Sequence, residues 1–117
     1  MDQARKNRLE AGGVQVDAAL ERLMGSEALL ERLLQKFAAD GNFQKLEQAL
    51  DSRDQEGAVA ASHTLKGMCG NLSMEPLYGL FTRQVVALRA GDWARALALR
   101  EDICPAYRQV LAAIGEG

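Results

Sequence analysis

The sequence has few residues that could form disulfides, interrupt helices or bind metal ions. Its 117 residues include two cysteines, two prolines and one histidine, and aromatic residues make up only 5%. Cys69 and Cys104 are too few, and too far apart in the sequence, for a disulfide framework or a metal motif, so we expect two buried thiols. A di-metal bundle needs Glu-x-x-His pairs, and the residue three positions before His63 is Ala60, which excludes that class of protein.

Long apolar runs and clustered basic charge are also absent. No segment approaches the roughly 20 apolar residues that span a bilayer, and residues 1–10 are too polar for a secretory signal. The formal net charge is −2 and the basic residues are scattered, so we expect neither nucleic acid nor a membrane as partner. With 48% apolar and 26% charged residues, the chain fits one soluble domain, which we expect in the cytoplasm.

Helical periodicity runs through most of the chain, without persistent β-type alternation. Residues 1–13 end in two glycines and are predicted to form a flexible lead-in to a single domain over residues 14–117. A short amphipathic helix is expected at residues 16–24. Ser26 can cap the helix that follows, and residues 40–42 (Asp-Gly-Asn) predict a turn before another helical stripe.

Three helices are predicted in the second half of the chain. Ser52 and Gln55 match a capping box for a helix that ends near Leu72, and Ser73 with Pro76 opens the next helix.

The last helix is expected at residues 93–114, with Asp92 as its cap and Pro105 kinking or splitting it. The pattern predicts an all-α fold, an antiparallel four-helix bundle with an additional short N-terminal helix. No apolar stripe is left over once the bundle is built, so we expect a monomer.

The helix that ends near Leu72 carries the only histidine. At about 100° per residue, its apolar positions gather into one core stripe: Ala58, Ala61, Leu65, Met68 and Leu72. His63 lies roughly 170° from this stripe, together with Lys66, Gly67 and Gly70. His63 is therefore predicted to face away from the core.

The residues around His63 are unusual for a solvent-exposed surface that binds nothing. Lys66 lies one turn further on, within reach of a group bonded to the imidazole. Gly67 and Gly70 each cost about 0.8–1 kcal/mol of helix stability relative to alanine, which is explained if another protein's backbone approaches the ring. Each glycine alone could instead serve packing against a neighbouring helix. Val59, about 40° from His63, could join a docking patch or be a helix-edge residue packed beneath a neighbour.

A neutral imidazole offers a lone pair that can attack phosphorus and pass the phosphoryl group onward to a carboxylate. Lys66 would offset part of the roughly −2 phosphoryl charge. The hydroxyl of Thr64 could orient the ring or the phosphoryl group, or it could simply be solvated. Cys69 points about 120° away from His63, which disfavours a Cys–His nucleophile.

Residues 62–72, Ser-His-Thr-Leu-Lys-Gly-Met-Cys-Gly-Asn-Leu, resemble the signature around the phosphoacceptor of bacterial histidine-containing phosphotransfer (HPt) domains. The resemblance extends over about residues 14–112, including Leu77, Leu80 and the Leu-Arg-Ala-Gly-Asp of residues 88–92. Its histidine-lysine-glycine core is the specific part, since leucine spacing alone would not identify the family.

The resemblance implies a four-helix bundle with phosphohistidine at His63, Lys66 as electrostatic partner, and Gly67 and Gly70 clearing space for a partner. The implied partners are receiver domains of response regulators and of hybrid sensor histidine kinases. Phosphoryl groups would pass between their aspartates through His63. Receiver domains bring their own Mg²⁺, so no cofactor of this chain is implied.

Three positions depart from the family pattern: Ser62 replaces the common alanine before the histidine, Ser73 stands where many members have glycine, and the third faces the histidine. The family often places a glutamate or glutamine against the histidine from the next helix, and Val85 stands at that position here. The adjacent Gln84 either takes over the contact to the imidazole or is a core glutamine bonded to backbone.

Two other classes of protein remain open. A helical adaptor could share the bundle without carrying phosphate, and a chemotaxis-kinase phosphoacceptor module would belong to a longer chain. Autophosphorylation from ATP is not expected, because the sequence lacks a Gly-x-x-x-x-Gly-Lys-Ser/Thr loop and has no room for a kinase domain.

Overall fold

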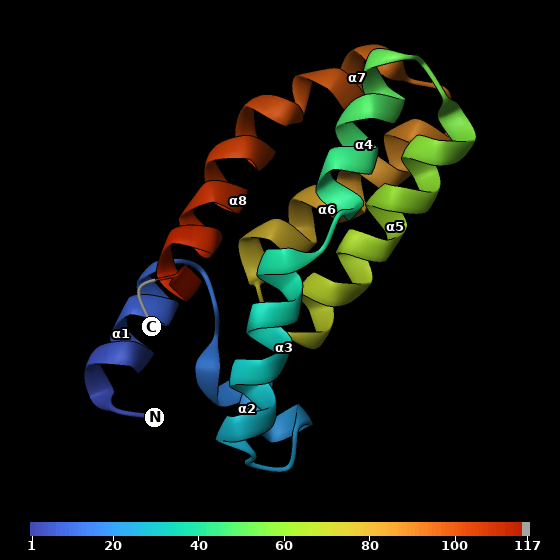
Figure 1. The fold of residues 1–117 in the computed structure, drawn as a ribbon. Coiled ribbons are helices and arrows are strands. Elements are labelled where there is room, and N and C mark those ends of the chain that lie inside the picture. The colour runs from blue at the N-terminus through green and yellow to red at the C-terminus, as the bar shows by residue number, and fades with distance from the viewer. Residues whose placement is uncertain (116–117) are drawn as a thin grey trace.

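A computed structural model describes residues 1–115, and these residues form helices without any strand (Figure 1). The all-α prediction is therefore confirmed. The helices are α1 (Gln3–Ala11), α2 (Val16–Arg22), α3 (Glu27–Ala39), α4 (Asn42–Asp51), α5 (Gln55–Asn71), α6 (Glu75–Arg89), α7 (Trp93–Ala98) and α8 (Arg100–Gly115).

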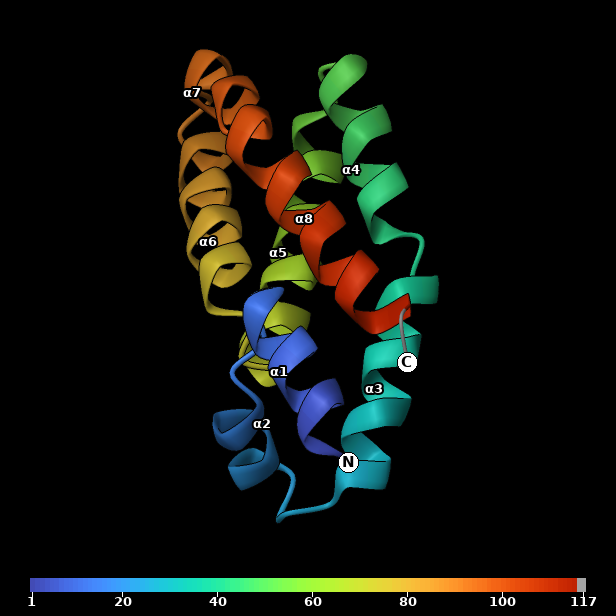
Figure 2. The same cartoon turned by 90° about the vertical axis from the view of Figure 1, so that its left-hand side faces the viewer.

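The helices form an antiparallel bundle. The chain runs up through α3 and α4, down through α5, up through α6 and down through α7 and α8 (Figures 1 and 2). Helix α5 packs against both α4 and α6, and α8 packs against α6 and α3. Large apolar side chains from almost every helix fill the centre, among them Leu34, Phe37, Leu65, Phe81 and Ile103. Helix α5 therefore has a neighbouring helix on each side and keeps one face exposed to solvent.

Residues 1–13 differ from the predicted flexible lead-in, because they contain helix α1 packed on α8. Leu9 is completely buried, and the Arg5 guanidinium donates to the carbonyls of Ala113 (2.8 Å) and Ile114 (3.0 Å). A Cβ at Gly12 would lie 2.6 Å from Ala113 Cβ. Gly12 thus permits close packing of two helices, which a linker-like Gly-Gly pair does not reveal in sequence. The bundle carries two N-terminal helices, α1 and α2, where one was predicted.

Several predicted helix ends are confirmed. Ser26 Oγ accepts a hydrogen bond from Leu29 N (3.2 Å), and Asp92 Oδ1 accepts one from Arg95 N (3.1 Å). In the turn before α4, Asp40 Oδ1 accepts from Asn42 N at 2.8 Å. These short polar side chains satisfy backbone N–H groups that have no partner inside the helix.

The predicted cap of α5 is wrong by two residues. Asp54, not Ser52, caps the helix by accepting from Gly57 N (3.0 Å), while the Ser52 hydroxyl donates back to Gln48 O (3.0 Å) at the end of α4. Arg53 lies between them with φ of 58°, which reverses the chain and shifts the start of the helix. Gln55, read as the capping-box partner, instead donates to Leu88 O of α6 (2.6 Å).

The start of α6 and the break in the last helix were predicted only in part. Pro76 lies in the first turn of α6 as expected, but Ser73 is not the cap: it has φ of 53° and its hydroxyl accepts from Arg22. The last helix is split, although the break falls at Leu99, well before Pro105, which lies inside α8. At Leu99 the carbonyl accepts from Asp102 N (3.1 Å) as well as Ile103 N (2.9 Å), so the helix tightens locally there.

Candidate functional site

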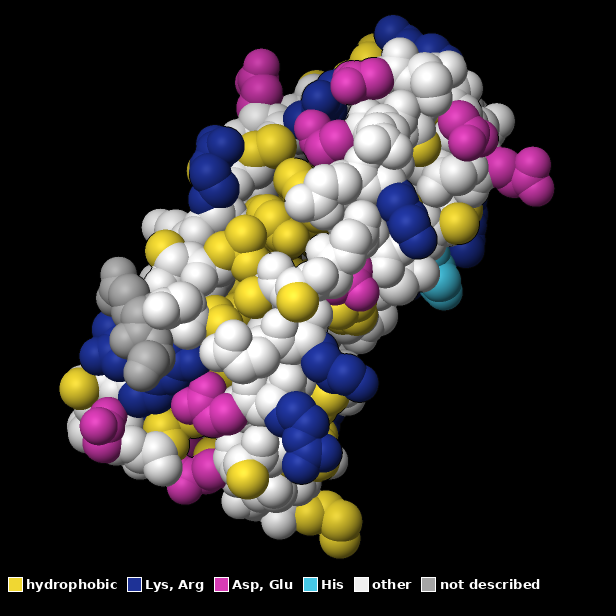
Figure 3. All heavy atoms as spheres, in the orientation of Figure 1, with side chains coloured by type: hydrophobic (Ala, Val, Ile, Leu, Met, Phe, Trp, Pro, Cys, Tyr) yellow, Lys and Arg dark blue, Asp and Glu magenta, His cyan; other side chains and the backbone are white. Residues whose placement is uncertain are grey.

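His63 lies in the middle of α5 with its side chain in solvent. The opposite side of this helix is buried as predicted: Ala58, Ala61, Leu65 and Leu72 are at most 4% exposed. Met68 is half-buried, and the completely buried Cys69 takes a place in the core beside the predicted stripe. In Figure 3 the histidine, in cyan, stands at the outline of the molecule. The division of α5 into a core face and a histidine face is therefore confirmed.

The other predicted residues of this face lie on both sides of His63. Thr64 is exposed and borders a shallow groove toward α4, whose other walls include Lys45 and Gln48. Val59 is half-buried, packed against the core, and borders a second shallow groove toward α6 with Arg89. The two grooves share Asp54 and Ala60, and His63 lines neither of them.

Lys66 is half-buried, one turn beyond His63. Within residues 1–115, lysine and arginine side chains form ion pairs such as Lys6–Asp17 (2.9 Å) and Arg100–Glu47 (2.8 Å), but Lys66 takes part in none. Its ammonium is therefore free to meet a negative group on the imidazole.

Gly67 and Gly70 have different surroundings. A Cβ added at Gly67 would have nothing within 4 Å apart from its own helix, so packing within this chain does not require glycine there. A Cβ at Gly70 would lie 2.9 Å from Tyr78 Cε1 of α6, so Gly70 has a packing role inside the fold. Sequence reasoning missed Tyr78, because the pairing of α5 with α6 is needed to bring it against Gly70.

Gln84 lies in the core and not on the surface that carries His63. Its side chain is completely buried; Oε1 accepts from Ser62 Oγ (3.3 Å) and Nε2 donates to Ala96 O (3.2 Å). These contacts correct the assignment of Gln84 as a partner-binding residue and support the core alternative. Val85 is also buried, with 2% exposure, because α6 turns it toward the α5 interface.

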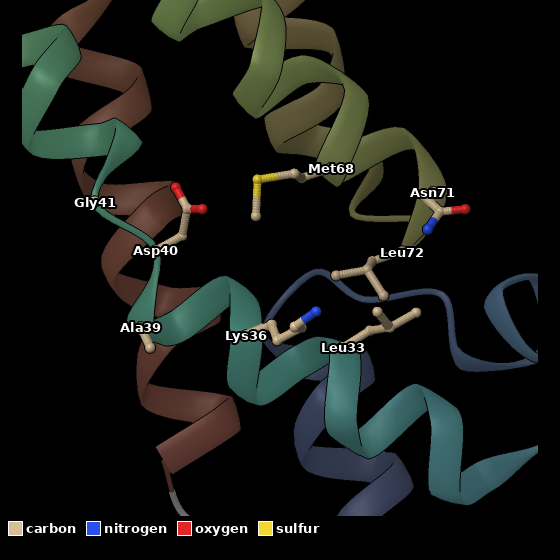
Figure 4. Close-up of a pocket in the computed structure, with 8 residues that line it drawn as sticks. All are labelled: Leu33, Lys36, Ala39, Asp40, Gly41, Met68, Asn71 and Leu72. Carbon is tan, nitrogen blue, oxygen red and sulfur yellow. The ribbon is translucent and has the colours of Figure 1, made fainter.

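A further groove of about 550 Å³ lies between the end of α3 and the end of α5 (Figure 4). Leu33 and Leu72 form its apolar side, and Met68 reaches from α5 toward Asp40 at its other end. No local sequence pattern predicts this groove, because its walls come from α3 and α5, which are separated in the chain by α4.

Residues 1–115 contain neither a metal-binding cluster nor a membrane-spanning helix. No group of three or more histidine, cysteine, aspartate or glutamate side chains comes together there as a metal site. In the same part of the chain, every helix is too short or too polar to cross a bilayer.

Comparison with known proteins gives one match. The Hpt domain family model matches residues 28–116, which include His63 and the helices from α3 onward but neither α1 nor α2. No curated protein and no solved structure matches the chain.

Proposed function

Given that this chain belongs to the Hpt domain family, whose members have a phosphotransfer role in two-component phosphorelays, we propose that His63 is its phosphoacceptor. The chain relays a phosphoryl group between receiver-domain aspartates, from a hybrid sensor histidine kinase to a response regulator. It acts as a carrier without kinase activity of its own. We further propose that it works as a cytoplasmic monomer.

One observation carries this proposal: the single histidine stands in solvent on an otherwise well-packed helix, beside a glycine that packing does not require. Neither a core role for His63 nor a packing role for Gly67 explains the arrangement. A partner that must bring an aspartyl phosphate up to the imidazole needs an accessible ring. It also needs a helix surface beside the ring from which no side chain protrudes.

The transfer step needs no group beyond the two proteins and the partner's metal ion. An imidazole nitrogen of His63 attacks phosphorus with its lone pair, forming the N–P bond. The P–O bond to the partner aspartate breaks, and its electron pair remains on the carboxylate oxygen. The proton on the other ring nitrogen stays there, and the reverse sequence delivers the phosphoryl group to the next aspartate. A Mg²⁺ ion brought by the receiver would compensate charge on the receiver side, and the step as proposed uses no cofactor of this chain.

The neighbouring residues serve this step. Lys66, free of intramolecular ion pairs, places its ammonium near the phosphoryl oxygens. Gly67 lets the partner's backbone approach, while Gly70 admits the Tyr78 ring that borders the same face. Thr64 and Val59 flank His63 on the α4 and α6 sides and contact the receiver there.

The test is phosphoryl transfer from a receiver domain labelled on its aspartate, with wild-type protein compared with His63→Gln. Phosphohistidine hydrolyses in acid whereas phosphoserine survives, so acid lability identifies the bond. We expect acid-labile label on the wild type alone. Label on neither protein across a panel of receivers would favour an adaptor that binds without carrying phosphate, and label on both would place the phosphoacceptor elsewhere.

A further inference from the structure

We infer that Lys45 of α4 is a second cation of the site, which binds the acidic surface of the receiver while the receiver covers Gly67 on the α4 side of His63. This inference rests on the proposed function and adds a positioning residue on a different helix from the histidine. Lys45 sets the affinity for the receiver, whereas Lys66 meets the phosphoryl group.

Two contacts define the sides of α5 next to the histidine. Ser62 donates to Gln84 of α6 and so marks the α6 side. Thr64 borders the groove that also contains Lys45, and so it marks the α4 side. At about 100° per residue these two marker residues lie on opposite flanks of α5, each about 100° from His63.

Gly67 lies on the α4 side of the histidine. It is about 60° from Thr64 and about 140° from Ser62 around the helix. A Cβ there would meet nothing within 4 Å outside its own helix, whereas a Cβ at Gly70 would meet the Tyr78 ring of α6. Packing within the chain therefore accounts for one of the two glycines. The other, which only a partner explains, places that partner on the α4 side.

Lys45 lies close to the level of His63 on the neighbouring helix. Helices α4 and α5 pack together and run in opposite directions from the turn at Arg53 (Figures 1 and 2). Lys45 is eight residues before Arg53 and His63 is ten residues after it, so at 1.5 Å per residue they differ by about 3 Å along the helix axes.

A receiver on this side also reaches α4. Packed helices lie about 8–10 Å apart, and a specific interface buries about 800 Å² on each partner. The Lys45 side chain is exposed and borders the same groove as Thr64. A partner that covers both the imidazole and Gly67 therefore meets the Lys45 ammonium.

The Lys45 ammonium has no ion-pair partner in the part of the chain that the structure describes. Glu47, two residues further along α4, pairs with Arg100 at 2.8 Å. Asp54, which borders the groove where α5 begins, accepts from Gly57 N at 3.0 Å as the cap of that helix. Both carboxylates have other partners, so the charge of Lys45 remains available to another protein.

The receiver's own chemistry supplies the complementary charge. A receiver that brings Mg²⁺ to its phosphorylated aspartate must bind that ion through oxygen ligands, of which carboxylates are the usual protein donors. The receiver surface around the aspartate is therefore acidic. A lysine facing this surface attracts the receiver and fixes its orientation on the imidazole.

The two lysines meet different parts of the negative charge. Lys66 lies three residues beyond His63 on the same helix, where side chains are neighbours, so its ammonium reaches the phosphoryl oxygens. It is about 40° from Ser62 around α5, which places it on the α6 side. Lys45 approaches from α4 on the opposite side, where it pairs with a carboxylate of the receiver. Loss of Lys45 should therefore weaken receiver binding and leave the transfer step unchanged.

The experiment measures the rate of transfer against the concentration of a labelled receiver domain, chosen from a panel as the fastest donor to the wild type. Lys45→Ala should raise the half-saturating concentration about threefold, and Lys45→Glu about tenfold, equivalent to about 1.4 kcal/mol. The rate at saturation should stay at the wild-type value. Lys45→Arg should transfer as the wild type does. Added salt should weaken the wild type more than Lys45→Ala, because salt screens exposed charges.

Two variants serve as controls. Arg83→Glu changes the net charge as Lys45→Glu does, at an exposed residue of α6. Arg83 lies about 100° from Gln84 and about 140° from Tyr78, both of which contact α5, so it faces away from the histidine helix. Arg83→Glu should therefore transfer as the wild type does. Lys66→Ala should show the opposite pattern to Lys45→Ala, with a lower rate at saturation.

The outcomes separate this inference from the proposed function. An unchanged half-saturating concentration in Lys45→Glu, or an equal rise in Arg83→Glu, would overturn the role of Lys45 and leave His63 as phosphoacceptor. A lower rate at saturation in Lys45→Ala, without a raised half-saturating concentration, would overturn its assignment as a positioning residue. A wild type that takes no label from any receiver would overturn the proposed function, and the role of Lys45 with it.

Discussion

Ser62 Oγ of α5 donates to Gln84 Oε1 of α6 across 3.3 Å in the core, at the residue immediately before His63. Gln84 Nε2 continues this link to Ala96 O of α7 at 3.2 Å. A fully buried glutamine thus joins three helices directly behind the histidine, and its hydrogen bonds compensate for the removal of its amide from water.

Gln84→Leu should destabilise the fold without slowing transfer through His63. The substitution leaves the Ser62 hydroxyl and the Ala96 carbonyl without these partners, which costs about 1–3 kcal/mol. Urea unfolding measures the free energy of unfolding, and receiver-labelled transfer measures the function. The double variant Ser62→Ala/Gln84→Leu is the control, because removing both partners should be less destabilising than the two single effects added together. Slower transfer by folded Gln84→Leu protein would instead show that Gln84 acts on the imidazole.

Gly67→Ala should raise stability and slow transfer. The added methyl group would touch nothing within 4 Å outside its own helix, so the helix gains about 0.8–1 kcal/mol. The same methyl group would meet the receiver's backbone beside His63. Gly79→Ala on α6 is the matched control, since its Cβ would have only Arg83 Nη2 nearby, at 3.8 Å. It should stabilise similarly and transfer normally; equal transfer by both variants would contradict close approach at Gly67.

Glu31 should make the stability of the fold depend on pH in the acid range. The hydrogen bond and charge of Arg5 lower the pKa of Glu31 below its ordinary value of 4.5. The ion pair therefore stabilises the fold above that ordinary value, and the contribution is lost as the pH falls through the lowered pKa. Because the Glu31 side chain is 37% exposed, we expect less than about 1 kcal/mol. Urea midpoints above and below pH 4.5 should differ less for Glu31→Gln than for the wild type; an equal difference would contradict this role.

The two cysteines should differ in reactivity toward an alkylating reagent. Burial raises the pKa of the Cys69 thiol to about 12 and shields it completely, whereas the Cys104 side chain is half-buried. In native protein we expect alkylation at Cys104 only, because the thiolate is the reactive form. Peptide mass spectrometry locates the label, and protein unfolded in urea should be modified at both. Native labelling of Cys69 at the rate of Cys104 would show that α5 opens readily.

Local signals in the sequence were sufficient for much of the architecture. Ser26, Asp92 and Pro76 mark helix starts where they were predicted, because capping depends on residues within one turn. The prediction of Ser52 as a cap was wrong because Arg53 adopts a left-handed conformation, so α5 begins later. Nothing in the local sequence pattern requires that conformation at Arg53. The prediction of a flexible lead-in was wrong because Gly12 lacks a side chain for a different reason: it allows close contact with a helix about a hundred residues later.

The sequence by itself determined that the chain is helical and that His63, Lys66 and Gly67 share the face of α5 opposite the core, because a helix places residues by spacing alone. Only the tertiary structure decided what lies across from that face. The register between α5 and α6 buries Gln84, sets Tyr78 against Gly70 and leaves Val86 in solvent. That register depends on how side chains from several helices pack together at the same time. The residue pattern of a single helix does not specify it.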